Sequence, residues 1–154
     1  MLFYRARTGT KDIPLPWVRA LSLLALAAYP IGALILALGS ARVVAVAAGY
    51  GLILAALIAA AALVGSSAQR IVGEQPEKLD EYEVHLRQRT LSLSYACFTV
   101  LVLLTVVYGA IAADKGLWLP RTYGEFNGLF WGVFLYASLL PTAVLAWALD
   151  AEPA

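Results

Sequence analysis

The residues best suited to chemistry lie in one short charged stretch. His85, the only histidine in the chain, follows Glu81 and Glu83 and precedes Arg87 and Arg89. A histidine among carboxylates could bind a metal, respond to pH or accept a phosphoryl group. No second nitrogen or sulfur ligand accompanies it, so the stretch has too few donors for a structural metal site. The pattern indicates a solvated helix surface, and we expect these five residues to contact a partner, with no metal or cofactor.

Other reactive side chains are scarce. The single cysteine, Cys97, excludes an intrachain disulfide framework and a CxxC redox motif. It lies inside an apolar run, which favours a buried or lipid-facing thiol. The hydroxyl side chains of the same run do not all share one helix face, so we expect hydrogen bonds between helices and no lined pore. These hydroxyl residues are Ser92, Ser94, Tyr95, Thr99, Thr105 and Tyr108.

The composition is that of a membrane protein. Of 154 residues, 62% are hydrophobic and 14% are charged, and the mean hydropathy is +0.79. Soluble domains average about 45–50% apolar and about 25% charged residues, so this chain cannot cover itself with polar surface in water. The net charge of +1 indicates no electrostatic attraction to nucleic acid.

Four apolar runs are long enough to cross a bilayer, which requires about 20 residues each. They predict an all-α polytopic membrane protein, with four transmembrane helices in one antiparallel bundle and one domain. The short connection at residues 39–42 makes the first two helices antiparallel neighbours. Pro30 and Pro141 predict kinks, and a neighbouring helix must satisfy each carbonyl that a proline frees. The predicted spans are residues 17–38, 43–64, 91–113 and 128–149.

The third span is expected to extend into the cytoplasm. Residues 65–75 form a polar linker, and Pro76 followed by acidic residues is typical of a helix start. We therefore predict a cytoplasmic helix over about 76–90 that continues into the membrane as far as Ala113. Asp114, Lys115 and Gly116 then form a C-cap signal.

Two rows of small residues predict helix-packing faces, because small side chains allow helix backbones to approach closely in lipid. The residues of each row recur at intervals of four. The first row is Ala47, Gly51, Ala55 and Ala59, and the second is Gly124, Gly128 and Gly132.

Aromatic residues gather in the predicted loop at 114–127 and just beyond it. Trp118, Tyr123, Phe126 and Trp131 are typical of a belt at the membrane interface. The same residues could line a site for a lipid or a small apolar molecule.

Lysine and arginine residues predict the orientation, because cytoplasmic loops carry an excess of them. The two termini and the central connection carry eight, and the two other connections carry three. Both termini are therefore expected in the cytoplasm. Arg19 lies in the first turn of the first span, close enough to the surface to extend toward it.

Several classes of membrane protein are excluded because the sequence lacks the residue types that they require. No Asp, Glu, Lys, Arg or His lies deep within a predicted span, although ion-coupled transport needs such groups. Small multidrug exporters require a glutamate in their first span, where this chain offers only Ser22 and Tyr29. Four-helix quinone-linked disulfide enzymes need cysteine pairs, and four-helix b-type cytochromes need several histidines. No nucleophile–base pair is present either, so we expect no enzymatic activity.

Two segments carry a resemblance to known sequences. Residues 79–89, LDEYEVHLRQR, run directly into an apolar span, and residues 139–147 read LLPTAVLAW. Both resemble short four-span bacterial inner-membrane proteins of unknown function, over the last half of the chain. The resemblance implies a bacterial inner membrane, and it implies no activity or site residues.

Two functions are expected from these observations. The first is a non-enzymatic accessory, regulatory or scaffold subunit, whose partners are membrane lipids and another membrane or cytoplasmic protein or a second copy of the chain. The alternative is a protein that binds or transports a lipid or a small apolar molecule near the aromatic loop.

Overall fold

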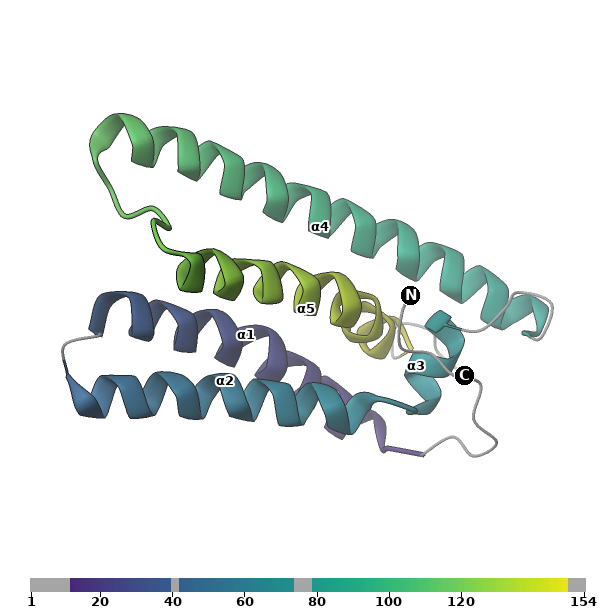
Figure 1. Ribbon diagram of the computed structural model, residues 1–154. Coiled ribbons are helices and arrows are strands. Elements are labelled where there is room, and N and C mark those ends of the chain that lie inside the picture. The colour runs from purple at the N-terminus through teal and green to yellow at the C-terminus, as the bar shows by residue number, and fades with distance from the viewer. Residues whose placement is uncertain (1–11, 40–41, 74–78, 150–154) are drawn as a thin grey trace.

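The computed structural model describes residues 12–39, 42–73 and 79–149, and all five secondary-structure elements in these ranges are α-helices (Figure 1). Four of them are long and apolar enough to cross a membrane. The prediction of an all-α polytopic membrane protein is therefore confirmed. In chain order the helices are α1 Leu15–Gly39, α2 Val43–Leu63, α3 Ser67–Gly73, α4 Glu81–Lys115 and α5 Tyr123–Ala148.

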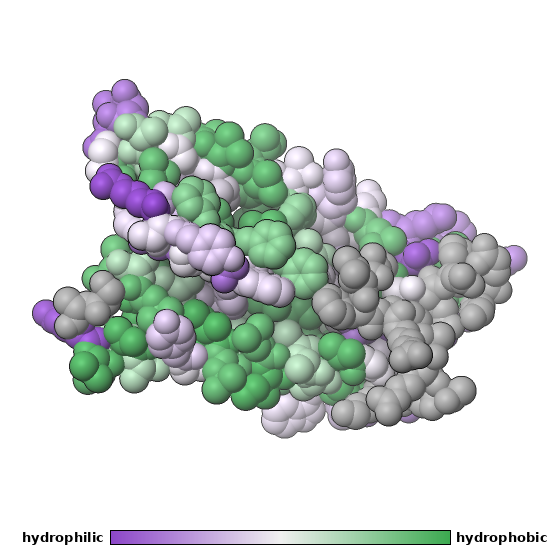
Figure 2. All heavy atoms as spheres, in the orientation of Figure 1, coloured by the Kyte–Doolittle hydropathy of each residue, from purple (hydrophilic) through white to green (hydrophobic). Residues whose placement is uncertain are grey.

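The long helices pack side by side in the order α2, α1, α5, α4 (Figure 1). The short helix α3 lies at one end of this row, where it contacts α4 and α5. We call this end the α3 end, and the opposite end, where α4 turns into α5, the loop end. Figure 2 shows apolar residues over much of the long helices, with hydrophilic residues gathered toward the two ends.

Proline residues are accommodated in α1 in two ways. Pro16 lies in the first turn, where a missing N–H costs no helical hydrogen bond. Pro30 lies inside the helix and leaves the carbonyl of Leu26 without its usual N–H donor. The hydroxyl of Tyr136 on α5 donates to this carbonyl at 2.6 Å. A neighbouring helix thus satisfies the freed carbonyl, as expected.

Helices α1 and α2 approach each other closely at two glycines. A Cβ built on Gly32 would lie 2.7 Å from the carbonyl oxygen of Gly49, and one on Gly49 would lie 3.0 Å from that of Gly32. The buried residues of α2 are Gly49, Ala56, Ala59 and Leu63. Of the predicted row, Ala59 is buried and Ala55 is half-buried, whereas Ala47 and Gly51 are exposed. The face that α2 turns to α1 therefore differs from the predicted row.

The segment 65–75, expected as a linker, contains helix α3. Gly65 adopts a left-handed conformation with φ of 82°, and the N–H of Gln69 donates to Ser66 Oγ. The side-chain oxygen of Gln69 in turn accepts from the N–H of Gly65 at 3.0 Å. Ser66 and Gln69 have the spacing of a capping box, which is a sequence signal for a helix start.

Helix α4 is continuous but begins later than predicted. Leu79 and Asp80 are not helical, and Asp80 accepts a hydrogen bond from the N–H of Glu83 at 2.6 Å, as an N-cap. The expected start at Pro76 lies outside the described residues. The helix then runs 35 residues, or about 52 Å, to Lys115. Gly116, with φ of 66°, ends it as predicted.

Helix α5 begins at Tyr123, five residues before the predicted span. Thr122 and Glu125 form a complete capping box, in which the side chain of each residue accepts a hydrogen bond from the backbone N–H of the other. The connection between α4 and α5 is therefore shorter than the predicted aromatic loop.

Burial is uneven along the row of helices. Within the most apolar 18-residue window of each helix, 39% of the residues of α5 are buried but only 6% of those of α4. Helix α5 thus lies at the centre of the packing, and α4 lies at its margin.

Candidate functional site

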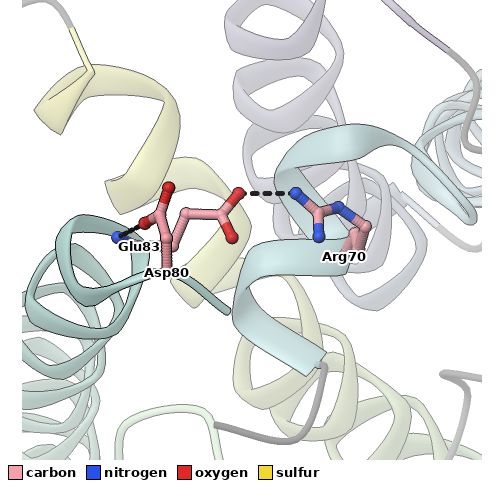
Figure 3. A network of polar contacts seen from close by, with 3 residues as sticks. All are labelled: Arg70, Asp80 and Glu83. Atoms are coloured by element: carbon pink, nitrogen blue, oxygen red, sulfur yellow. Dashed lines mark hydrogen bonds and ion pairs between the residues drawn. The ribbon is translucent and has the colours of Figure 1, made fainter. Parts of the chain in front are cut away.

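The charged stretch of α4 is divided between two helix faces, one of which packs on α3. Arg70 of α3 forms an ion pair with Glu83 at 2.5 Å, and Asp80 caps the same turn of α4 (Figure 3). One turn later, Arg87 Nε donates to the carbonyl of Val72 at 3.2 Å. Glu83 and Arg87 therefore hold α4 against α3.

Apolar packing explains why this face turns inward. Leu86 is buried between the two charged residues, and Thr90 and Ser94 continue the buried line at intervals of four. Residues four apart lie on the same side of a helix. Burial of Leu86 and Thr90 therefore aims the neighbouring Glu83 and Arg87 side chains at α3.

The other three predicted contact residues are exposed. Glu81, His85 and Arg89 also recur at intervals of four and so share one face of α4. Tyr82 and Gln88 are exposed beside them. We call Glu81, His85 and Arg89 the exposed triad. Of the five predicted contact residues, Glu83 and Arg87 thus pack against α3, whereas the exposed triad lies on another face of α4.

Replacing Glu83 with glutamine should lower the free energy of unfolding by about 1 kcal/mol, because a partly buried charge-assisted pair is lost. The two side chains are only 30% and 19% exposed, so water screens the pair less than it screens a surface pair. Glu81→Gln is the matched control, with no loss expected. Unfolding of the detergent-solubilised protein measures both, and equal stability of the two variants would contradict the role given to Glu83.

Ser94 and Thr105, two of the hydroxyl residues of α4, bond within their own helix and not between helices, contrary to the prediction. Ser94 donates to the carbonyl of Thr90 at 2.7 Å, and Thr105 donates to that of Leu101 at 2.8 Å. Serine and threonine can reach the carbonyl four residues earlier in their own helix, so no partner helix is needed. Two tyrosines on other helices, Tyr29 and Tyr136, do make interhelical hydrogen bonds, because their hydroxyls extend beyond their own backbone.

Tyr29 on α1 contacts two glycines of the predicted row on α5. The hydroxyl of Tyr29 on α1 donates to the carbonyl of Gly128 at 2.9 Å. A Cβ on Gly132 would lie 3.1 Å from the Tyr29 ring, whereas one on Gly124 or on Gly128 would meet nothing within 4 Å. Gly132 therefore allows the close approach of the Tyr29 ring, and Gly128 contributes only its carbonyl to the contact between α1 and α5.

The aromatic residues line the loop end without forming one closed site. Trp118, Tyr123, Phe126 and Trp131 are all exposed. Trp131 makes edge-to-face contacts with Phe130 and Phe134, each with ring centroids 5.7 Å apart. The carbonyl of Trp118 accepts the hydroxyl of Tyr108 at 2.9 Å, which ties the connection to α4. These rings present an open aromatic surface on the connection between α4 and α5 and along α5.

Arg19 has a structural role that the sequence did not reveal. Its Nε donates to the carbonyl of Ala146 at 2.9 Å, and its guanidinium lies 5.0 Å from the ring centroid of Trp147. A cation over an aromatic face is stabilised by the ring's negative charge distribution. Arg19 thus joins the first turns of α1 to the end of α5.

The described ranges contain no group of three or more His, Cys, Asp or Glu side chains that could hold a metal ion. His85 stands on an exposed face, and Cys97 is exposed on α4. The exposed triad is therefore the part of the charged stretch that lies on the face of α4 away from Glu83 and Arg87. No protein-family model, curated protein or solved structure matches this chain.

Proposed function

We propose that this chain is a non-enzymatic accessory subunit of a membrane assembly, which binds its partner through the exposed triad. The observation that supports this function most directly is the division of the charged stretch. Glu83 and Arg87 are engaged with α3, whereas Glu81, His85 and Arg89 share one exposed face.

The exposed triad is preorganised for binding, because the part of α4 that carries it is fixed by the rest of the fold. The Asp80 cap and the contacts with α3 fix the first turns of α4, so little backbone conformational entropy remains to be lost on association. Glu81 and Arg89 are about 12 Å apart along the helix and carry opposite charges. A helix or strand with a basic and an acidic residue at this separation would be complementary.

The proposed setting is the bacterial inner membrane, with the α3 end in the cytoplasm. The excess of lysine and arginine in the termini and the central connection supports this orientation. The triad would then face the cytoplasm just beyond the lipid headgroups. A cytoplasmic segment of another membrane protein, a cytoplasmic protein or a second copy of the chain could reach it.

Substitution of Glu81, His85 and Arg89 by alanine together should reduce co-purification of the partner from native membranes at least tenfold. Tenfold corresponds to about 1.4 kcal/mol, which three charge contacts at an interface margin can supply. Glu83→Gln is the matched control from the same stretch, and it should retain the partner. Equal recovery of every co-purifying protein with the triple variant would contradict the proposed function.

A further inference from the structure

The charges of the exposed triad have a fixed order along α4. Glu81 lies in the first turn of the helix, His85 follows one turn later, and Arg89 comes last. Arg89 is followed almost directly by Leu91, where the apolar part of the helix begins. At about 1.5 Å per residue, Arg89 therefore lies next to the membrane-spanning stretch, and Glu81 lies about 12 Å farther from it.

The rest of the fold keeps the charges at these levels. Helix α4 is continuous from Glu81 to Lys115, so the triad and the apolar stretch belong to one helix. Asp80 caps the first turn, and Arg70 of α3 pairs with Glu83, which lies between two members of the triad. The distances of the three charges from the membrane are therefore set by the fold.

A second copy of the chain is a poor match for this order of charges. Copies of one membrane protein insert in the same orientation, because their charged connections determine it. A symmetric pair in one membrane then has its twofold axis perpendicular to the membrane, and both copies use the same surface. Each member of the triad would face the same residue of the other copy, Glu81 against Glu81 and Arg89 against Arg89. Like charges that face each other oppose association.

A complementary segment has the opposite order of charges. It carries a basic residue level with Glu81 and an acidic residue level with Arg89, about 12 Å apart. Because Arg89 lies beside the membrane, the acidic residue must lie there too, and a segment that continues into a membrane span holds it at that level. Cytoplasmic segments usually carry lysine and arginine next to the membrane. The order that complements α4 is therefore uncommon, and it distinguishes a partner from most other membrane proteins.

We propose, on the basis of the proposed function, that the partner of the exposed triad is a different membrane protein and not a second copy of this chain. The contacting segment flanks one of the partner's membrane spans, with an acidic residue at the membrane surface and a basic residue about 12 Å beyond it. Glu81 pairs with the basic residue, and Arg89 pairs with the acidic one. His85 faces the middle of the segment.

A charge-swapped copy of the chain serves as a partner of known charge order. Glu81→Arg with Arg89→Glu reverses the order and keeps the net charge. One copy of the natural order and one charge-swapped copy are complementary, whereas two copies of the same order are not. The full chains, with different tags, are co-expressed in one bacterial membrane, and His85→Cys with Cys97→Ser in both leaves one cysteine in each copy. The mixed pair should form about fivefold more disulfide-linked dimer than either pair of the same order.

A cysteine on the other edge of the molecule is the matched control. Leu54 is exposed on α2, which lies at the opposite end of the row of helices from α4. With Leu54→Cys in place of His85→Cys, mixed and like pairs should cross-link equally. If the charge-swapped copy fails to insert, Glu81→Lys with Arg89→Asp carries the same reversal. Equal cross-linking of mixed and like pairs through position 85 would overturn the proposal.

Cross-linking of the native partner completes the test. Photoreactive side chains at positions 81 and 89 should attach to one other membrane protein, beside a lysine or arginine from position 81 and beside an aspartate or glutamate from position 89. Attachment to a second copy of the chain would overturn the proposal. If the triple alanine variant loses its partner but the attachment sites lack these charges, only the charge order is wrong. If that variant keeps every partner, the triad is not the binding surface, and the proposed function fails as well.

Discussion

Replacing Gly32 with alanine is expected to destabilise the protein by about 1–3 kcal/mol, because the added methyl group overpacks the contact between α1 and α2. The new Cβ would lie 2.7 Å from the carbonyl oxygen of Gly49 and 3.0 Å from Cγ1 of Ile53. A backbone oxygen cannot rotate away as a flexible side chain can, so the two helices must separate. Thermal unfolding in detergent, followed by circular dichroism, measures the loss.

Gly51→Ala on α2 is the matched control, since a Cβ there meets nothing within 4 Å. Alanine is favoured over glycine in a helix by roughly 0.5–1 kcal/mol, so this variant should be as stable as the wild type or slightly more stable. The same stability for Gly32→Ala and Gly51→Ala would show that α1 and α2 do not meet at Gly32.

Replacing Tyr136 with phenylalanine is expected to cost about 1–3 kcal/mol, the penalty of leaving a partly buried acceptor unpaired. Pro30 has no N–H for the carbonyl of Leu26, and the Tyr136 hydroxyl donates to that carbonyl at 2.6 Å. The same unfolding experiment measures this effect. Tyr50→Phe, at an exposed position on α2, controls for removal of a hydroxyl and should be close to neutral.

A double-mutant cycle with Pro30→Ala separates this explanation from a general effect of the substitution. Alanine at position 30 restores an N–H that the carbonyl of Leu26 can accept. Tyr136→Phe should therefore cost less in the Pro30→Ala background than in the wild type. An identical cost in both backgrounds would mean that the proline does not create the need for the tyrosine.

The spans could be predicted closely because length and hydropathy determine them. The structure extends the first predicted span by two residues at its start and one at its end, and it shortens the second by one residue. The starts of α3 and α5 were missed, although both carry the spacing of a capping box at Ser66–Gln69 and Thr122–Glu125. The expected start of the third helix relied on Pro76 and overlooked Asp80 as an N-cap.

Which side of a membrane helix faces a neighbour was much harder to predict. In water, a polar face marks the outside of a helix, but a helix in lipid is apolar on every side. For this reason Gly49 was not distinguished from Gly51. For the charged residues of α4, the sequence could not show which of them face α3, because nothing in it reveals that Arg70 pairs with Glu83.

The most direct test of the proposed function is a scan of photoreactive side chains through positions 81–89 of the full chain in native membranes. A partner bound to the exposed triad predicts cross-links from positions 81, 85 and 89 to one protein. It predicts none to that protein from positions 83, 86 and 87, which face α3 or lie buried. No protein cross-link from positions 81, 85 and 89, or cross-links without this four-residue period, would contradict the assignment of the triad as the binding surface.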